Sequence, residues 1–346
     1  MVEASLGTGK LPLDLLQTLL TRHSRPDSRL VVGPQVGEDA AVIDMGHHYL
    51  VAKSDPITFA TDEIGWYVVH VNANDLATMG ATPRWFLLTL LLPEGQTDQA
   101  LVEGIFDQVS AACDSLGAVL SGGHTEVTYD LDRPIAVGVM LGEVEKEALV
   151  RTAGAQVGDA VILTKGVAIE GTAVLAREAR ELLAARVGAP MVERGRRFLQ
   201  EPGISIVRDA EIVRRTTDVH AMHDPTEGGL ATGLWELARA SGRGIVVELD
   251  RVPVFAETTA FCQALDLDPL GLIASGALVA TVPAKDADAV VRALAAHDIA
   301  ANEIGRVVDG PPVVEAIRAG GCARLPVFEQ DELARWFAQS AGRALP

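Results

Sequence analysis

The 346-residue chain is poor in aromatic side chains and in basic charge. Phe, Trp and Tyr make up only 4% of its residues, so a core must be built mainly from the Val, Leu, Ile and Ala that dominate its 48% hydrophobic content. Lys and Arg number 29 against 47 Asp and Glu, a net charge of −18. This balance argues against nucleic acid as a partner, because phosphate backbones are bound by basic surfaces. It does not exclude nucleotides, since a divalent cation can bridge carboxylates to phosphates.

Cysteine usage and hydropathy exclude two further classes of protein. The only three cysteines, Cys113, Cys262 and Cys322, have no metal-like spacing and are expected as small buried residues or free thiols in a reducing cytoplasm. The amino-terminal residues lack the apolar region of a signal peptide. No apolar run reaches membrane-spanning length, and 86–93, FLLTLLLP, is expected as a buried strand. The sequence therefore predicts a cytoplasmic protein without a membrane partner.

The two common nucleotide-binding motifs are also missing, because no GxGxxG follows a strand and no GxxxxGK[ST] occurs. Strands and helices do not alternate regularly in the first half of the chain, which favours an α+β fold over a doubly wound sheet. The length makes two domains the default expectation. The turn-rich stretch 149–159 marks the joint. We predict a first domain over residues 1–153 and a second over 154–346.

The stretch 61–83 is expected to organise the first domain. Its apolar residues recur at helical spacing, which predicts an amphipathic helix capped by Thr61 or Asp62 and ended by Gly80. Asp75 lies inside this apolar pattern, where a carboxylate needs a partner. A metal ion is one candidate for that partner, and water or a neighbouring loop is the other.

Two more aspartates are expected at the ends of strands. Asp39 follows Gly37 and Glu38 at a turn into an extended run, and Asp55 lies near the far end of strand 49–59. Aspartate is common in turns, so each residue taken alone is open to that explanation. Carboxylates gathered from separate elements are, however, the ligands that Mg²⁺ and Ca²⁺ prefer. Asp39, Asp55 and Asp75 together predict a divalent metal site.

Glycine pairs mark two further places of interest. Gly122-Gly123 follows a strand, and Gly228-Gly229 opens a helix after Asp224. Glycine lets backbone amides approach an anion closely, and it also permits a simple turn or tight packing against a neighbour. His220 and His223 fall on opposite faces of an alternating strand, which disfavours a zinc pair.

Six segments occur in the order found in the AIR synthase (PurM-like) superfamily, which the chain resembles from about residue 12 to residue 325. They are GEDAAV (37–42), SDPIT (54–58), NDLATMGATP (74–83), SGGHTEV (121–127), LTKGVAIEGTAVLA (163–176) and HDPTEGGLATGLWELA (223–238). The superfamily includes AIR synthase, thiamine-monophosphate kinase, selenide water dikinase and the hydrogenase-maturation protein HypE. With LDPLGLIASGALVA (267–280), the second half is most similar to the HypE group.

This resemblance implies a fold, a cofactor and a set of site residues. The fold is an amino-terminal mixed sheet that pairs across a homodimer into a barrel, followed by a carboxy-terminal α/β domain. ATP and Mg²⁺ are implied at the dimer cleft, and the γ-phosphate of ATP is used to phosphorylate or activate a small-molecule acceptor. The implied metal ligands are Asp39, Asp55 and Asp75. The implied nucleotide-binding residues are Lys53, Asn74, Gly122, Gly123, Thr125, Gly228 and Gly229. Of these, Gly122, Gly123 and Thr125 are implied as a nucleotide-contacting loop. The implied catalytic residues are Asp224, Lys165 and His124.

Three departures from the family pattern leave alternatives open. His124 stands where the family usually has Asp, and the chain ends in GRALP without the cysteine that HypE uses, so HypE dehydration chemistry is not expected. GTGK at 7–10 is a poor substitute for the family's glycine-rich amino-terminal stretch. The alternatives are a nucleotide-binding regulator or maturation partner with little turnover, and a phosphotransferase similar to thiamine-monophosphate kinase.

Overall fold

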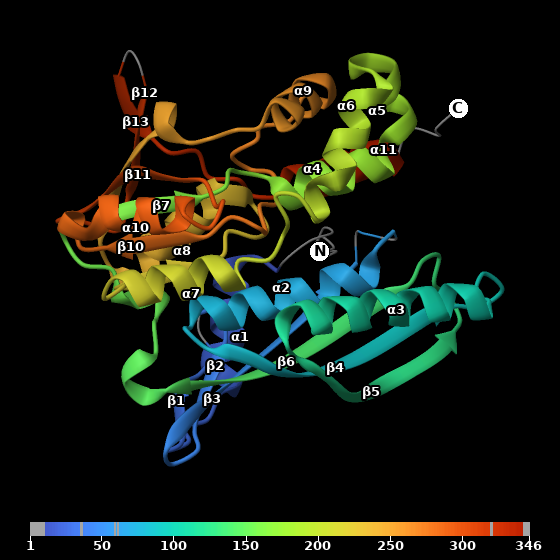
Figure 1. Cartoon of the computed structure of the whole chain (residues 1–346), viewed down its shortest axis with the longest axis horizontal. Coiled ribbons are helices and arrows are strands. Elements are labelled where there is room, and N and C mark those ends of the chain that lie inside the picture. Colours follow the sequence, from blue (N-terminus) through green and yellow to red (C-terminus); the bar gives the residue numbers. More distant parts are fainter. Residues whose placement is uncertain (1–10, 35–36, 59, 61, 319–320, 342–346) are drawn as a thin grey trace, which may run out of the picture.

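The computed structural model describes residues 11–34, 37–58, 60, 62–318 and 321–341. Two units, each a sheet with helices packed on it, lie against one another (Figure 1). The predicted α+β class is confirmed. The segment GTGK (7–10), compared above with the family's glycine-rich amino-terminal stretch, lies outside the described residues. Within the described chain, no helix combines the length and the apolar character needed to cross a bilayer.

The first unit contains a six-stranded sheet in the order β1-β2-β3-β6-β4-β5 within the described residues. Only β4 and β5 pair in parallel, so the sheet is mixed as expected, and it is open, with β1 and β5 at its edges. Its strands are β1 (Leu30–Val32), β2 (Ala41–Asp44), β3 (His48–Ile57), β4 (Thr82–Pro93), β5 (Val119–Thr128) and β6 (Ile135–Glu145). Its helices are α1 (Leu13–His23), α2 (Ile64–Thr78) and α3 (Gln99–Leu116).

The second unit contains a seven-stranded sheet in the order β13-β12-β9-β11-β7-β10-β8, again counting described residues. Its strands are β7 (Ala160–Thr164), β8 (Ala221–His223), β9 (Gly244–Glu248), β10 (Val279–Val282), β11 (Ala301–Val308), β12 (Val314–Arg318) and β13 (Gly321–Arg324). Its helices are α4 (Ile169–Glu178), α5 (Arg180–Val187), α6 (Ala189–Arg196), α7 (Val207–Thr216), α8 (Gly229–Ser241), α9 (Ala256–Leu265), α10 (Ala287–Ala295) and α11 (Glu332–Ala341).

Helix α2 lies at the centre of the molecule and is buried on nearly every side. It packs on β3 and β6 of its own sheet, against α3, and against α7 and β8 of the second unit (Figure 1). The expected amphipathic helix with one buried face is therefore wrong, because the second unit covers the face that would otherwise meet water. The cap also differs: Glu63, with φ of 62°, precedes the helix, while Asp62 pairs with Arg177 at 3.2 Å. Thr61 lies outside the described residues.

Candidate functional site

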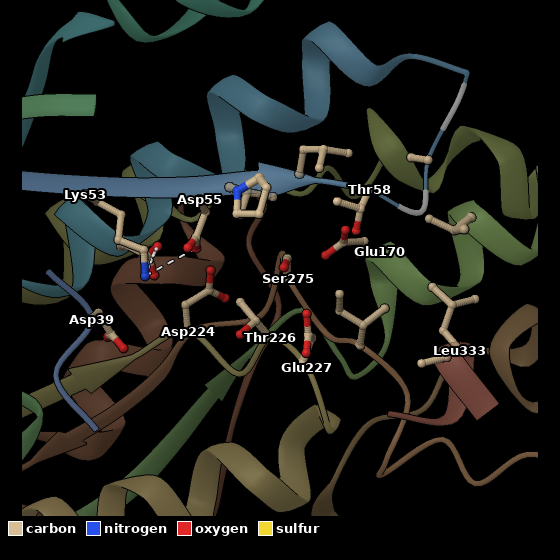
Figure 2. A pocket seen from close by; sticks show the side chains of 18 of the residues that line it. Asp39, Lys53, Asp55, Thr58, Glu170, Asp224, Thr226, Glu227, Ser275 and Leu333 are labelled. Atoms are coloured by element: carbon tan, nitrogen blue, oxygen red, sulfur yellow. Dashed lines mark ion pairs between the residues drawn. The ribbon is translucent and has the colours of Figure 1, made fainter. Parts of the chain in front are cut away.

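A pocket of about 870 Å³ lies between the two units and is lined by residues of both (Figure 2). The first unit contributes the 37–39 loop, β3 and α2, and the second contributes α4, the segment after β8, α8, the 273–275 segment and α11. Five of the predicted site residues line it: Asp39, Lys53, Asp55, Asp75 and Asp224.

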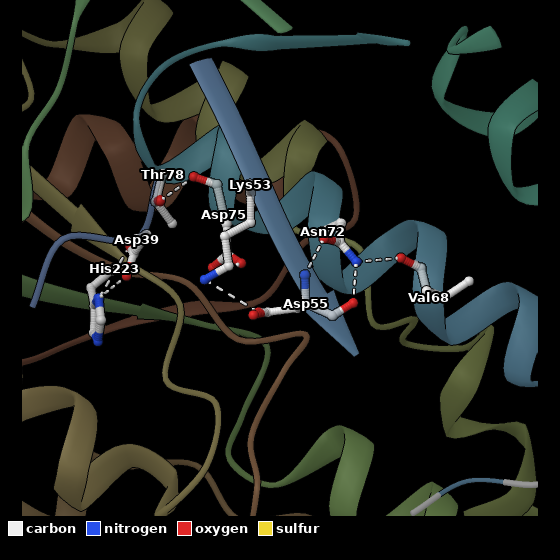
Figure 3. A network of polar contacts seen from close by, with 8 residues as sticks. All are labelled: Asp39, Lys53, Asp55, Val68, Asn72, Asp75, Thr78 and His223. Carbon is white, nitrogen blue, oxygen red and sulfur yellow. Dashed lines mark hydrogen bonds and ion pairs between the residues drawn. The ribbon is translucent and has the colours of Figure 1, made fainter. Parts of the chain in front are cut away.

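Lys53 forms ion pairs with two of these carboxylates (Figure 3). Its Nζ lies 3.2 Å from Asp55 Oδ2 and 3.1 Å from Asp75 Oδ2. Burial alone lowers the pKa of an ammonium group, but Asp75 and Asp55 outweigh it and raise the pKa of Lys53 above its ordinary value. Burial also raises the pKa of Asp75 well above the usual range, although Lys53 opposes that shift. Lys53 thus offsets part of the negative charge of these two carboxylates.

Asn72 explains how these side chains are positioned. Lys53 and Asp55 are two residues apart on β3 and therefore share a face of the strand. The Asn72 side chain of α2 donates to the backbone oxygens of Asp55 at 3.2 Å and Val68 at 2.8 Å, and it accepts from the Asp55 amide at 2.8 Å. This buried amide, conspicuous in an apolar helix, fastens β3 to α2 beside the carboxylates (Figure 3).

His223 links Asp39 to the second unit. Its Nδ1 lies 3.0 Å from Asp39 Oδ1, and its Nε2 lies 3.0 Å from Glu236 Oε2. Burial lowers the pKa of an imidazolium, yet Asp39 and Glu236 together raise the pKa of His223 well above its ordinary value. The imidazolium in turn lowers the pKa of Asp39 despite the burial of that carboxyl. His220 instead bonds Asp159 at 2.8 Å, so the two histidines serve different partners.

Two further carboxyl groups in the pocket have unsatisfied oxygens. No hydrogen bond of ordinary geometry reaches either carboxylate oxygen of Asp224 or Oε2 of Glu170, although Asn74 and Ser275 respectively lie near enough to lower their pKa values. Burial is the largest cause of their shifts, and it raises the pKa of Asp224 to about 8 and that of Glu170 to about 7. A buried carboxyl without partners is costly, so these oxygens are places where a cation or a hydrogen-bond donor gains most.

In the part of the chain that the structure describes, no group of three or more His, Cys, Asp or Glu side chains is gathered closely enough to hold a metal ion. Lys53 takes up two of the predicted ligands instead. The donor set nevertheless fits a hard cation in kind, because Asp39, Asp55, Asp75 and Asp224 present carboxylate oxygens to one pocket. The metal site stays a prediction.

Two other predicted residues are committed to backbone groups and do not line the pocket. Lys165 Nζ donates to the carbonyl oxygens of Ser205 at 2.6 Å and Gly276 at 2.9 Å, and it pairs with Asp209 at 3.2 Å. Asn74 donates to Ile204 O at 2.8 Å and accepts from Ile206 N at 2.9 Å. Both side chains hold the 203–206 segment, so the geometry gives them structural partners rather than a ligand.

The Gly228-Gly229 pair also lies beside the pocket rather than in its lining. The Gly228 amide donates to Asp331 Oδ2 at 2.6 Å, so an anion does meet this turn, but it belongs to the chain itself. A Cβ on Gly229 would lie 2.5 Å from Leu270 O and 2.7 Å from Leu272 O. Of the two explanations that the sequence left open, tight packing accounts for this glycine.

The expected nucleotide-contacting loop around Gly122 is wrong as a loop, because these residues belong to β5. The strand register shifts between Phe86 and Leu87 of β4, and a Cβ on Gly123 would overlap the Leu88 carbonyl there. The glycines thus serve a β-bulge. His124 is exposed and lies 3.0 Å from Glu126 Oε2, and like Thr125 it does not line the pocket.

Comparison with known proteins identifies the family. Residues 37–144 match the family model for the AIR synthase related protein amino-terminal domain, and residues 156–317 match the model for its carboxy-terminal domain. A putative hydrogenase expression/formation protein of Methanocaldococcus jannaschii is 31% identical over 304 residues, which cover 85% of this chain and 86% of that protein. The chain belongs to the AIR synthase related family.

Other members extend the comparison to the HypE group. Carbamoyl dehydratase HypE of Cupriavidus necator is 31% identical over 258 residues, 73% of this chain and 70% of that protein. A crystal structure of the hydrogenase maturation protein HypE in complex with ATP superposes with a TM-score of 0.67 at 25% identity, covering 92% of this chain and 91% of that one. The PurM-like two-domain fold implied by the sequence resemblance is therefore confirmed. The barrel across a dimer involves a second chain and stays a prediction, as do the limits 1–153 and 154–346.

Sequence reasoning missed several pocket residues of this family member. Glu170, Ser275 and Glu236 belong to separate elements of the second unit, and α11 closes one end of the pocket. Glu170 was visible only as a charged residue within the segment 163–176, where a carboxylate at the start of a helix has an ordinary explanation. Its burial depends on packing against the 273–275 segment about a hundred residues later, which no local pattern reveals.

Proposed function

We propose that the chain is an ATP- and Mg²⁺-dependent enzyme that uses the γ-phosphate of ATP to phosphorylate or activate a small-molecule acceptor. The observation that carries this proposal is the convergence of Asp39, Asp55, Asp75 and Asp224 with Lys53 in one pocket. The ATP complex of a HypE relative of the same fold supports the choice of nucleotide. The volume of about 870 Å³ is within the range of about 300–1,000 Å³ that ligand pockets occupy.

The proposal assigns separate tasks to these side chains. Asp39, Asp55 and Asp75 hold Mg²⁺, which supplies charge neutralisation for the phosphates when it is bound. Lys53 offers a second positive charge beside the same carboxylates. His223, held by Glu236, fixes the orientation of Asp39. Asp224 stands at the reacting end, where its uncompensated oxygens face the pocket. Positioning and electrostatics then supply most of the rate.

Asp75→Asn tests the proposal directly. The variant removes a buried negative charge from the ligand set, and we expect its affinity for Mg-ATP to fall by about tenfold or more, as calorimetry would measure. Asp44→Asn is the matched control, because Asp44 pairs with Lys146 at 2.7 Å and does not line the pocket. Circular dichroism would check that both variants fold. Absence of Mg-ATP binding to the wild-type chain, or unchanged affinity in Asp75→Asn, would contradict the assignment.

We also propose that the chain forms a homodimer through the first sheet. β5 is an edge strand whose residues are exposed along most of its length, with Val119 and Val127 more than half exposed. An exposed edge with apolar side chains is a template for pairing with another chain. Gly122, Gly123, His124 and Thr125 lie on this edge, so a partner is the means by which they would come near a nucleotide.

A further inference from the structure

The pocket has a second end that the Mg-ATP proposal does not use. Figure 2 shows Lys53 and Asp39 on one side of the pocket and Leu333 of α11 on the other, with Glu170 and Ser275 between them. Phe337 of α11 also lines this second end. It therefore combines an apolar wall with a small set of polar groups, as small-molecule sites do.

Glu170 is a buried polar group at this end, and its backbone is held in place. Its side chain is 6% exposed, and no hydrogen bond of ordinary geometry reaches its Oε2 atom. The backbone that carries it is fixed, because the Glu170 amide donates to Ser275 O at 3.3 Å and the Gly171 amide donates to Ile273 O at 3.1 Å. A Cβ on Gly171 would lie 2.5 Å from Leu272, so the α4 amino end is packed tightly onto this segment. The carboxyl is thus buried on a backbone segment that is held in place.

The charges around Glu170 limit what this end can bind. Glu227 also lines the pocket and adds negative charge, and Asp224 adds more when it ionises. The three described cationic side chains that line the pocket are already beside acids. Lys53 lies between Asp55 and Asp75, and Arg133 lies 3.4 Å from Asp132. The third, His223, lies between Asp39 and Glu236. An anionic group placed beside Glu170 would meet like charges without a free counter-charge, which costs several kcal/mol in such sites.

We propose that this end of the pocket is the acceptor subsite, and that the acceptor donates a hydrogen bond to Glu170 through an amine, amide or hydroxyl group and packs an apolar portion against Leu333 and Phe337. An anionic acceptor such as a phosphomonoester is excluded. The inference rests on the proposed function, because that proposal assigns the aspartate end of the pocket to Mg-ATP. The titration of Glu170 agrees with it: burial raises the pKa to about 7, so a bound cation readily favours the ionised carboxylate at neutral pH.

Four probes with one carbon skeleton test the chemistry of this subsite: n-butylammonium, n-butanol, butyrate and butyl phosphate. Their binding to the full chain would be measured by ligand-observed NMR, with and without Mg-ADP. We expect n-butylammonium and n-butanol to bind and the two anions not to bind. Glu170→Gln should weaken n-butylammonium by about tenfold or more, because a bond to a charged acceptor is lost. It should leave n-butanol nearly unchanged, because the glutamine oxygen still accepts a hydrogen bond.

Controls separate this inference from the proposed function. Glu181→Gln on α5 removes an exposed carboxylate and should change no probe. Calorimetry on the same samples should show that Glu170→Gln leaves the affinity for Mg-ATP within about twofold of wild type. A wild-type chain that fails to bind Mg-ATP would contradict the proposed function. The probe results would still show which chemical groups bind beside Glu170. The acceptor subsite is overturned if the anions bind as well as n-butylammonium, if neither n-butylammonium nor n-butanol binds, or if Glu170→Gln weakens no probe. It is also overturned if that variant weakens Mg-ATP as strongly as n-butylammonium, because the nucleotide then occupies this end.

Discussion

Glu170 couples the stability of the fold to pH. Burial raises its pKa from 4.5 to about 7. Between these two values the unfolded chain releases a proton that the folded chain keeps, so the free energy of unfolding falls as pH rises, by about 1.4 kcal/mol per pH unit. The penalty is absent well below pH 4.5 and complete above about pH 7, where it amounts to something on the order of 3 kcal/mol.

Glu170→Gln should remove this penalty, because a glutamine side chain does not ionise. We expect the variant to exceed wild type in stability by up to about 3 kcal/mol at about pH 8 and to show little advantage at about pH 4. Urea unfolding at the two pH values measures the difference. Glu181→Gln, which alters an exposed carboxylate, should show no such trend. A difference between Glu170→Gln and wild type that stays constant with pH would contradict the raised pKa.

Single residues also show where sequence reasoning succeeds. Asp39, Asp55 and Asp75 could be predicted as a group because strand ends and a helix place them by local rules, and the family resemblance added Asp224. The structure brings all four to one pocket. The hydrogen-bond and ion-pair partners of individual side chains could not be predicted. The resemblance implied a catalytic role for Lys165, but its ammonium group donates to carbonyl oxygens up to 111 positions away in the chain. Such pairings depend on how distant segments pack, which no spacing in the sequence encodes.

At the scale of elements, α8 has a glycine with positive φ at each end. Gly229 has φ of 63° and Gly242 has φ of 65°, a region that costs other residues about 1–2 kcal/mol. The surroundings differ: a Cβ on Gly229 would lie 2.5 Å from a backbone oxygen, whereas a Cβ on Gly242 would have nothing within 4 Å. Substitution of these two glycines therefore distinguishes the cost of the backbone conformation from the cost of steric overlap.

Gly242→Ala should destabilise the fold by about 1 kcal/mol, the cost of the backbone conformation alone. Gly229→Ala should cost at least about 2 kcal/mol more, because the backbone of 270–272 must also move. Denaturant titration of both variants gives the two free energies of unfolding. Equal losses would show that the packing around Gly229 gives way at no cost, contrary to the close approach found here.

Helices and strands differ in how well the sequence predicts them. The strand expected at 86–93 lies within β4, and the helix expected to open at Gly228-Gly229 matches α8, because apolar runs and helix-end glycines are local signals. The residues around Gly122 were expected as a loop but belong to β5, because a glycine pair occurs both in loops and in β-bulges. The bulge is defined by the register with β4, a partner strand some thirty residues earlier, and only the paired structure reveals it.

At the scale of the whole molecule, the pocket exists because two units that were predicted separately meet at α2. Asp39 on the first unit reaches His223 and Glu236 on the second, and Asn74 bonds the 204–206 segment across the same boundary. The length predicts two units, but not which faces meet. Asp75 within the apolar pattern of α2 was a signal that this helix is buried on more than one face, but a metal ion, water or a neighbouring loop explained it equally well.

The β5 edge is where the proposed dimer can be tested. Val127 lies on the β5 edge and is 54% exposed, so a lysine there should leave the single chain folded while it places a charge in any interface formed by this edge. We expect size-exclusion chromatography with light scattering to report a dimer for wild type and a shift toward monomer for Val127→Lys. Val157→Lys is the control, because Val157 is similarly exposed at 49% but precedes β7 in the second unit. A monomeric wild-type chain, or equal dimer content in all three proteins, would remove β5 as the interface. In that case Gly122, His124 and Thr125 would have no route to the nucleotide that the resemblance assigns to them.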